Sequence, residues 1–129
     1  MLKIFEKIIK AKKKTEPVIT AIDKVFQLKY DRLLIGELSY DNQKWTFTYS
    51  EDFKKVQHKY NHIAGFSNVD KLYQSEELWP FFQSRIPGLK QPAVKEILIK
   101  EHIDANNKFE LLKRFGKESI HNPYELELV

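Results

Sequence analysis

The sequence predicts an α+β domain in which a small antiparallel meander sheet, three strands plus a C-terminal strand, packs with about three helices. Apolar and polar residues alternate in three consecutive runs between residues 24 and 50, which is the period of half-buried strands. After residue 50 the alternation stops, and helix caps and stops follow until the last six residues alternate again. We therefore place one domain at residues 24–129, preceded at 1–23 by an amphipathic basic N-terminal helix and a linker.

The N-terminal segment, MLKIFEKIIKAKKK, has an apolar stripe at helical spacing formed by Leu2, Phe5, Ile8 and Ile9. It predicts a short helix that either docks loosely on its own domain or frays, or that binds a partner or an anionic membrane surface. These residues carry a net charge of +5 from six lysines and one glutamate, so the rest of the chain carries −1 of the total +4. A nearly neutral body gives phosphate no broad positive field, and beyond weak contacts through these lysines we expect no direct nucleic-acid binding.

The meander is expected in the runs VFQLKY, LLIGELSY and KWTFTY, which are separated by short polar turns. Trp45 and Phe47 fall on the same face of the third run, where we expect them to cover the sheet. Gly36 lies inside the second run, and glycine in a strand interior indicates a bulge or a close approach of another backbone. The tail YELELV alternates again and is expected to return to the sheet as the final strand.

The helices are expected from their caps. Ser50 is placed to cap a single turn in SEDFKKV, whereas residues 56–74 have no clear period and predict a loop with at most one short element. Pro80 either opens the next helix or distorts one that begins at Glu76, and this helix ends before Pro87.

Two further helices are expected from the residues that start and stop them. QPAVKEILIKEHI has Pro92 in its first turn, and NKFELLKRFG has Asn107 as its cap and Gly116 as its stop. The first of these helices is expected to bury an apolar stripe of Val94, Ile97, Leu98, Ile99 and Ile103.

The sequence gives little sign of catalytic or metal chemistry. His58 and His62 have the spacing of a two-histidine metal site but no glutamate between them, and DANNKFE resembles a calcium loop but lacks its glycine and glutamate. The four glycines lie far apart, so no glycine-rich phosphate loop can form, and there is no cysteine nucleophile. We expect a protein without cofactor or metal that is not an enzyme on its own.

The chain has no cysteine and no apolar run of the roughly 18 residues that a membrane span requires. Nor does its N-terminus have the uninterrupted apolar core of a secretory signal. The absence of cysteine suits a reducing compartment. We therefore expect a protein with no transmembrane segment that resides in the cytoplasm.

Three stretches in order, IGELSYDNQKWTFTYSEDF, LWPFFQSRIPG and KFELLKRFG, resemble the N-terminal subdomain of HipA-type serine/threonine kinase toxins. The resemblance covers about residues 24–118 and rests on the order and spacing of all three pieces. The chain departs from the family pattern after Pro87, and IHNPYELELV replaces the glycine-rich continuation into the kinase body. The matching residues are Gly36, Leu38, Trp45, Phe47, Tyr49, Pro80, Phe81, Phe82, Ile86, Pro87, Leu111, Leu112 and Gly116.

The resemblance implies a free-standing, HipS-like version of that subdomain. Such a protein acts as antitoxin to a separate HipA-like kinase in a bacterial toxin-antitoxin system, often with a HipB-like DNA-binding protein as a third component. No catalytic residue carries over, because the kinase residues have no counterpart in this sequence. The alternative is an interaction or structural domain with a different partner, which the basic N-terminal helix would target.

The aromatic cluster in LWPFFQSRIPG is the candidate contact surface, because tryptophan and other large side chains concentrate at interface hot spots. Phe81, Phe82 and Ile86 also suit a core, and Trp79 suits either place equally. The residues predicted to bind the partner are Trp79, Pro80, Phe81, Arg85, Pro87 and Gly88.

Overall fold

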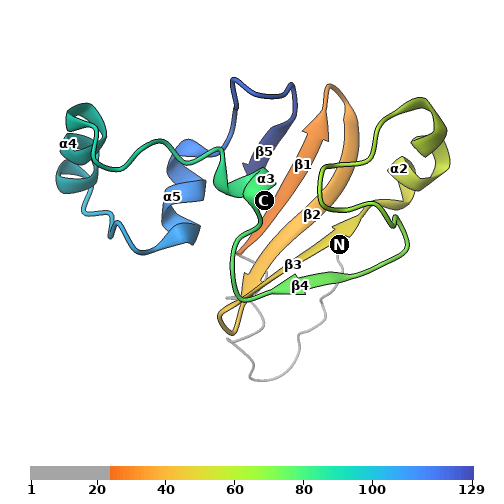
Figure 1. The fold of residues 1–129 in the computed structure, drawn as a ribbon, viewed down its shortest axis with the longest axis horizontal. Coiled ribbons are helices and arrows are strands. Elements are labelled where there is room, and N and C mark those ends of the chain that lie inside the picture. Colours follow the sequence, from red (N-terminus) through yellow and green to blue (C-terminus); the bar gives the residue numbers. More distant parts are fainter. Residues whose placement is uncertain (1–23) are drawn as a thin grey trace.

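The computed structural model describes residues 24–129, which form a five-stranded antiparallel sheet with four α-helices (Figure 1). The amphipathic helix and linker predicted at 1–23 lie outside the described residues. The strands are β1 (Val25–Tyr30), β2 (Leu33–Asp41), β3 (Lys44–Tyr49), β4 (Tyr73–Ser75) and β5 (Glu125–Leu128), in the spatial order β4-β3-β2-β1-β5. The α+β class, the meander and the returning C-terminal strand are confirmed.

Strand β4 is an addition to the expected sheet, within a segment where the sequence predicts a loop with room for one short element. It has three residues, too few to display a period of two, and it extends the sheet by pairing Tyr73 with Phe47 and Ser75 with Trp45. This strand forms through long-range pairing with β3, so its own short sequence does not predict it.

A bulge in β2 confirms the expectation for Gly36. The register shifts between Leu28 and Lys29, so that Leu28 pairs with Gly36, Lys29 pairs with Leu34, and Ile35 is the extra residue. A Cβ atom on Gly36 would lie 2.4 Å from the carbonyl oxygen of Thr48, so only glycine fits between β1 and β3 here.

The helices are α2 (Glu51–Val56), α3 (Pro80–Gln83), α4 (Pro92–Lys100) and α5 (Lys108–Phe115), with a 3₁₀ turn at Gln57–Lys59. Ser50 caps α2 and Asn107 caps α5, as expected, each by accepting a hydrogen bond from a backbone N–H three residues on. Of the two possibilities for Pro80, the structure has the first, since α3 begins at this proline. None of the helices within residues 24–129 is long and apolar enough to cross a membrane.

Helices α5 and α4 extend the fold sideways from the sheet. In Figure 1, α5 lies beside β5, and α4 lies farther out. Phe109 and Leu112 of α5 join the main core, whereas its neighbour Leu111 packs with Val94 and Leu98 of α4 in a second, smaller core. The expected stripe of α4 is wrong at Ile99, whose side chain is 76% exposed because α4 packs against α5 on one side only.

The main core lies on one face of the sheet and is rich in aromatic rings. Trp45 and Phe47 are both buried in it, as the alternation of KWTFTY predicts. Phe47 lies in contact with three other core rings, at centroid distances of 4.6 to 5.6 Å. Those rings belong to Tyr49, Phe66 and Phe82.

Candidate functional site

The candidate site is built around α3, which the sequence forces to be short. Trp79 is extended (φ −66°, ψ 150°), as the residue before a proline must be, and Pro80 then supplies the first helical residue. The helix stops after one turn at Gln83. Along it the side chains are progressively more buried, since Pro80 is exposed, Phe81 is half-buried and Phe82 is completely buried.

Trp79 is half-buried, so the structure gives it an intermediate place between the two that the sequence allows. Its ring meets the ring of Phe66 edge to face, with centroids 5.0 Å apart. Phe66 is fully buried in the loop before β4, and the phenol of Tyr49 holds that loop by donating to the carbonyl oxygen of Phe66 and accepting from the backbone N–H of Ile63. Burial raises the pKa of Tyr49 to about 12, so this phenol remains protonated and able to donate at neutral pH.

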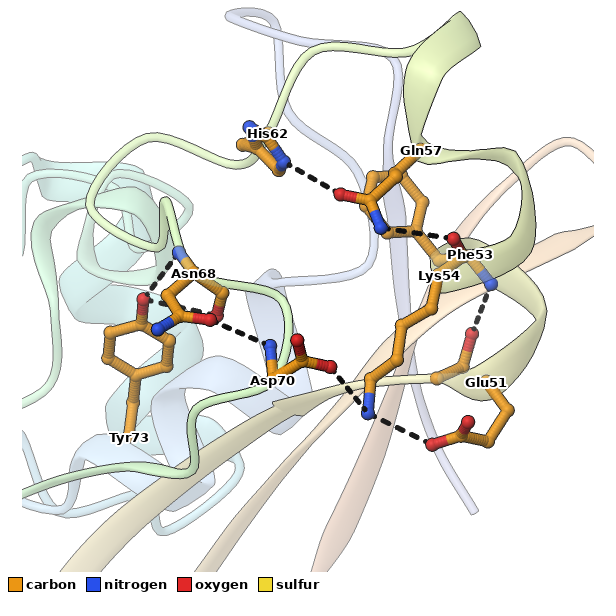
Figure 2. A network of polar contacts seen from close by, with 9 residues as sticks. Glu51, Phe53, Lys54, Gln57, His62, Asn68, Asp70 and Tyr73 are labelled. Carbon is orange, nitrogen blue, oxygen red and sulfur yellow. Dashed lines mark hydrogen bonds and ion pairs between the residues drawn. The ribbon is translucent and has the colours of Figure 1, made fainter.

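Polar contacts tie the same loop to α2 and to the 3₁₀ turn that follows it (Figure 2). Lys54 Nζ lies 2.9 Å from a carboxylate oxygen of Glu51 and 3.8 Å from one of Asp70, which bridges the helix to the far end of the loop. At the near end, His62 Nε2 lies 3.4 Å from Gln57 Oε1. The loop that supports Trp79 is therefore anchored at both ends.

The two histidines with metal-site spacing do not lie on a common helix. His58 belongs to the 3₁₀ turn and His62 to the extended loop after it, and both are exposed, so they do not share a helix face. Within residues 24–129 no three histidine or carboxylate side chains are grouped so that they could hold a metal ion.

Phe81 contacts three neighbours on the other side of α3. Its ring centroid lies 6.0 Å from that of Tyr124 and 5.1 Å from that of Phe82, and the guanidinium of Arg85 lies 5.7 Å from it. The Arg85 contact is in the range of a cation–π interaction. Phe81 thus joins α3 to the segment that leads into β5.

Arg85 is buried, with 4% of its surface exposed, and its guanidinium is a clamp inside the protein. Nη1 donates to the carbonyl oxygens of Gly116 at 2.8 Å and Lys117 at 3.2 Å, and Nη2 donates to Asn122 Oδ1 at 2.9 Å and to the carbonyl oxygen of Tyr124 at 2.7 Å. Burial lowers the pKa of Arg85 to about 10, which still leaves it charged at neutral pH. The sequence predicts that Arg85 contacts a partner, whereas in the structure its Nη atoms donate hydrogen bonds to residues 116–124 of its own domain.

A surface groove of about 420 Å³ lies between the end of α3 and residues 116–124, the segment that Arg85 holds. Arg85 and Pro87 line it, as do Glu118, Ser119 and His121. Ile120 also lines it and is 96% exposed, the most exposed of the large apolar side chains among the described residues.

The groove brings together only part of the set that the sequence predicts. Arg85 and Pro87 line it, but Trp79, Pro80, Phe81 and Gly88 do not. Sequence reasoning missed Ile120, although a lone isoleucine within the polar run ESIHNP was a usable signal. Such a residue has no apolar neighbour in sequence with which to form a core.

The polar groups of the groove serve its own loop. Ser119 Oγ accepts from the backbone N–H of His121 at 3.0 Å, which is a turn contact rather than the pairing of a hydroxyl with an imidazole base. A groove lined by charged, polar and apolar side chains suits the side chains of another protein.

Fold and groove together define a class: a small α+β domain whose core is aromatic and whose surface carries a groove of mixed character. The HipA N-terminal domain family matches residues 26–120, and the chain belongs to this family. No curated protein is similar enough to the chain to count as a match.

Proposed function

We propose that this chain is a non-catalytic module that binds a HipA-like serine/threonine kinase and regulates it, in the manner of a HipS-like antitoxin. The observation that carries the proposal is the family match over residues 26–120, because that family is by its description one domain of HipA. A domain of a larger protein has a surface adapted to the remainder of that protein. The kinase body is therefore the partner that we propose for this surface.

The groove beside α3 supports the proposal physically. Ile120 offers nearly its whole side chain to a partner, and burying an isoleucine contributes about 1.5–3 kcal/mol. The segment that carries it is held by Arg85, so little conformational entropy is lost when a partner binds.

In this proposal the contact surface contains the exposed and half-buried residues that the sequence selected, together with Ile120. Arg85 acts as a positioning residue, because its Nη donors are used inside the domain and its Nε, which has no partner there, is buried. The partner-contacting residues are then Trp79, Pro80, Phe81, Pro87, Gly88 and Ile120.

The test is co-expression of the tagged full chain with a HipA-like kinase, followed by size-exclusion chromatography and an autophosphorylation assay with labelled ATP. We expect co-elution and a changed rate of autophosphorylation. Ile120→Asp should weaken the complex by at least about tenfold, since a charge then replaces the exposed anchor. Leu72→Asp is the matched control, because Leu72 is also exposed (56%) but lies before β4 and outside the groove.

Two results would overturn the proposal. One is a chain that elutes as a free monomer beside every HipA-like kinase tested. The other is hydrolysis of ATP or another nucleotide by the purified chain alone, which would make it an enzyme rather than a binding module.

A further inference from the structure

Helix α4 is held to the domain by a small core. Only Val94 and Leu98 of its nine residues are buried, and they pack with Leu111 of α5. Partly buried apolar residues complete this core: Ile86, Leu89, Ile103 and Phe115. A helix of this length is unstable alone in water, so its tertiary contacts must hold it. Additional apolar contacts on the exposed side of α4 would therefore stabilise the helix.

An apolar groove of about 290 Å³ lies on the outer side of this helix. Lys95, Leu98 and Ile99 contribute from α4, where a spacing of three and four residues places them on one face. The other lining residues are Leu89, Ile103 and Ala105. Ile99 is 76% exposed, so this groove displays a large apolar side chain without a neighbour that covers it.

A single charged residue, Lys95, lines this groove, while the exposed carboxylates of Glu96 and Asp104 lie next to lining residues in the sequence. Within residues 24–129 neither Lys95 nor Lys100 forms an ion pair. Glu101, at the end of the helix, is engaged by Arg114, whose Nε and Nη2 donate to its carboxylate at 2.8 and 3.2 Å. This hydrogen bonding lowers the pKa of Glu101, which leaves its carboxylate committed to Arg114.

We propose that the α4 groove docks a protein segment that presents apolar side chains flanked by a carboxylate. Its apolar residues would cover Ile99 and Leu98, and its carboxylate would pair with Lys95. Charge argues against the chain's own residues 1–14, which carry +5, and against a second copy, which would present the same lysines. The groove shares no lining residue with the one beside Arg85, so this is a second surface beyond the proposed function.

The test uses two synthetic amphipathic helical peptides with identical leucine positions, one flanked by glutamates and the other by lysines. Each is titrated into the isotope-labelled full chain and followed by amide shifts in NMR spectra. We expect the acidic peptide to shift the amides of residues 89–105 and to bind about fivefold or more tightly than the basic one, because an attractive pair replaces a repulsive one. Raised salt should shrink that difference.

Variants make the test specific. Ile99→Asp should weaken binding of the acidic peptide by at least about tenfold, whereas Ile120→Asp, which alters an even more exposed isoleucine at the other groove, should leave it unchanged. Lys95→Glu should reverse the preference between the two peptides. Melting curves of all three variants establish that each is folded.

Four outcomes would overturn the inference: equal or tighter binding of the basic peptide, binding of a synthetic peptide of residues 1–14 at this groove, self-association of the chain that Ile99→Asp abolishes, or no shifts in residues 89–105 with either peptide at millimolar concentration. None of them bears on co-elution with a kinase, which Ile120→Asp tests separately.

Discussion

Replacing Arg85 by alanine tests whether this side chain is a clamp inside the domain or a contact for a partner. The substitution removes all four hydrogen bonds from the guanidinium to residues 116, 117, 122 and 124. A residue that serves only the partner could be truncated without loss of stability, whereas a clamp could not. We expect Arg85→Ala to destabilise the domain and to release the segment that carries Ile120.

The magnitude follows from two opposing contributions. Hydrogen bonds from a charged donor stabilise by about 1.5 kcal/mol each at the low end of their range, or about 6 kcal/mol for the four bonds. Against this, burial lowers the pKa of Arg85 from 12.5 to about 10, which corresponds to a cost of about 3 kcal/mol for the buried charge. The difference predicts that Arg85→Ala lowers the free energy of unfolding by about 3 kcal/mol.

The assay is urea unfolding at neutral pH, followed by tryptophan fluorescence, with amide hydrogen exchange of residues 116–124 as a local readout. Arg85→Lys keeps a charge but has no planar fork to reach four acceptors, so we expect most of the loss to persist. Lys90→Ala, a change at an exposed lysine on the same connection, is the control and should alter stability by less than about 0.5 kcal/mol. An Arg85→Ala protein as stable as the parent, with unchanged exchange in residues 116–124, would refute the clamp.

Three other substitutions test the fold. Phe82→Ala should lower the free energy of unfolding in urea by about 3–5 kcal/mol, because the ring is fully buried and leaves a cavity; a loss below 1 kcal/mol would contradict its place in the core. Gly36→Ala should cost about 1–3 kcal/mol, since the new Cβ would meet the Thr48 carbonyl at 2.4 Å. Gly88→Ala is its control, because there the nearest atom belongs to the flexible Gln91 side chain at 3.2 Å, and equal losses would refute the argument. Tyr49, with its pKa raised from 10.0 to about 12, keeps its proton in the folded state while the unfolded phenol loses it, so stability should fall by about 1 kcal/mol between pH 8 and pH 11. Tyr49→Phe should lack this component, and identical pH dependence in the two proteins would show that the phenol is not protected.

The elements that the sequence predicts correctly are those with local causes. The three runs of alternating residues, the proline that opens α4 and the asparagine that caps α5 all act within a few residues of themselves. Gly116 also follows the end of α5, as the sequence predicts, but its backbone is not left-handed, since φ is −87°. Glycine is needed there because a Cβ atom would lie 2.5 Å from the Leu112 carbonyl oxygen.

What the sequence could not predict depends on partners far away in the chain. Strand β4 exists because β3 pairs with it, and Ile99 is exposed because α4 has a neighbour on only one side. Arg85 is the sharpest case, since its acceptors lie 31 to 39 residues farther along and three of the four are backbone carbonyls, which no side-chain pattern reveals. An arginine in a connecting segment is ordinarily an exposed residue.

The arrangement around Arg85 also predicts that Arg85 and Ile120, which both line the groove, depend on each other in partner binding. Residues 117–124 lie between α5 and β5 without regular structure, so their carbonyl groups need donors from elsewhere, and one planar guanidinium supplies several at once. If the value of the clamp for binding is that it holds Ile120 in place, then Arg85→Lys should weaken the kinase complex only while Ile120 is present. In a double-mutant cycle, Ile120→Asp alone and Ile120→Asp with Arg85→Lys should therefore bind equally weakly, a non-additivity on the order of 1 kcal/mol or more. Additive losses would mean that Arg85 acts on the partner by a route that does not pass through Ile120.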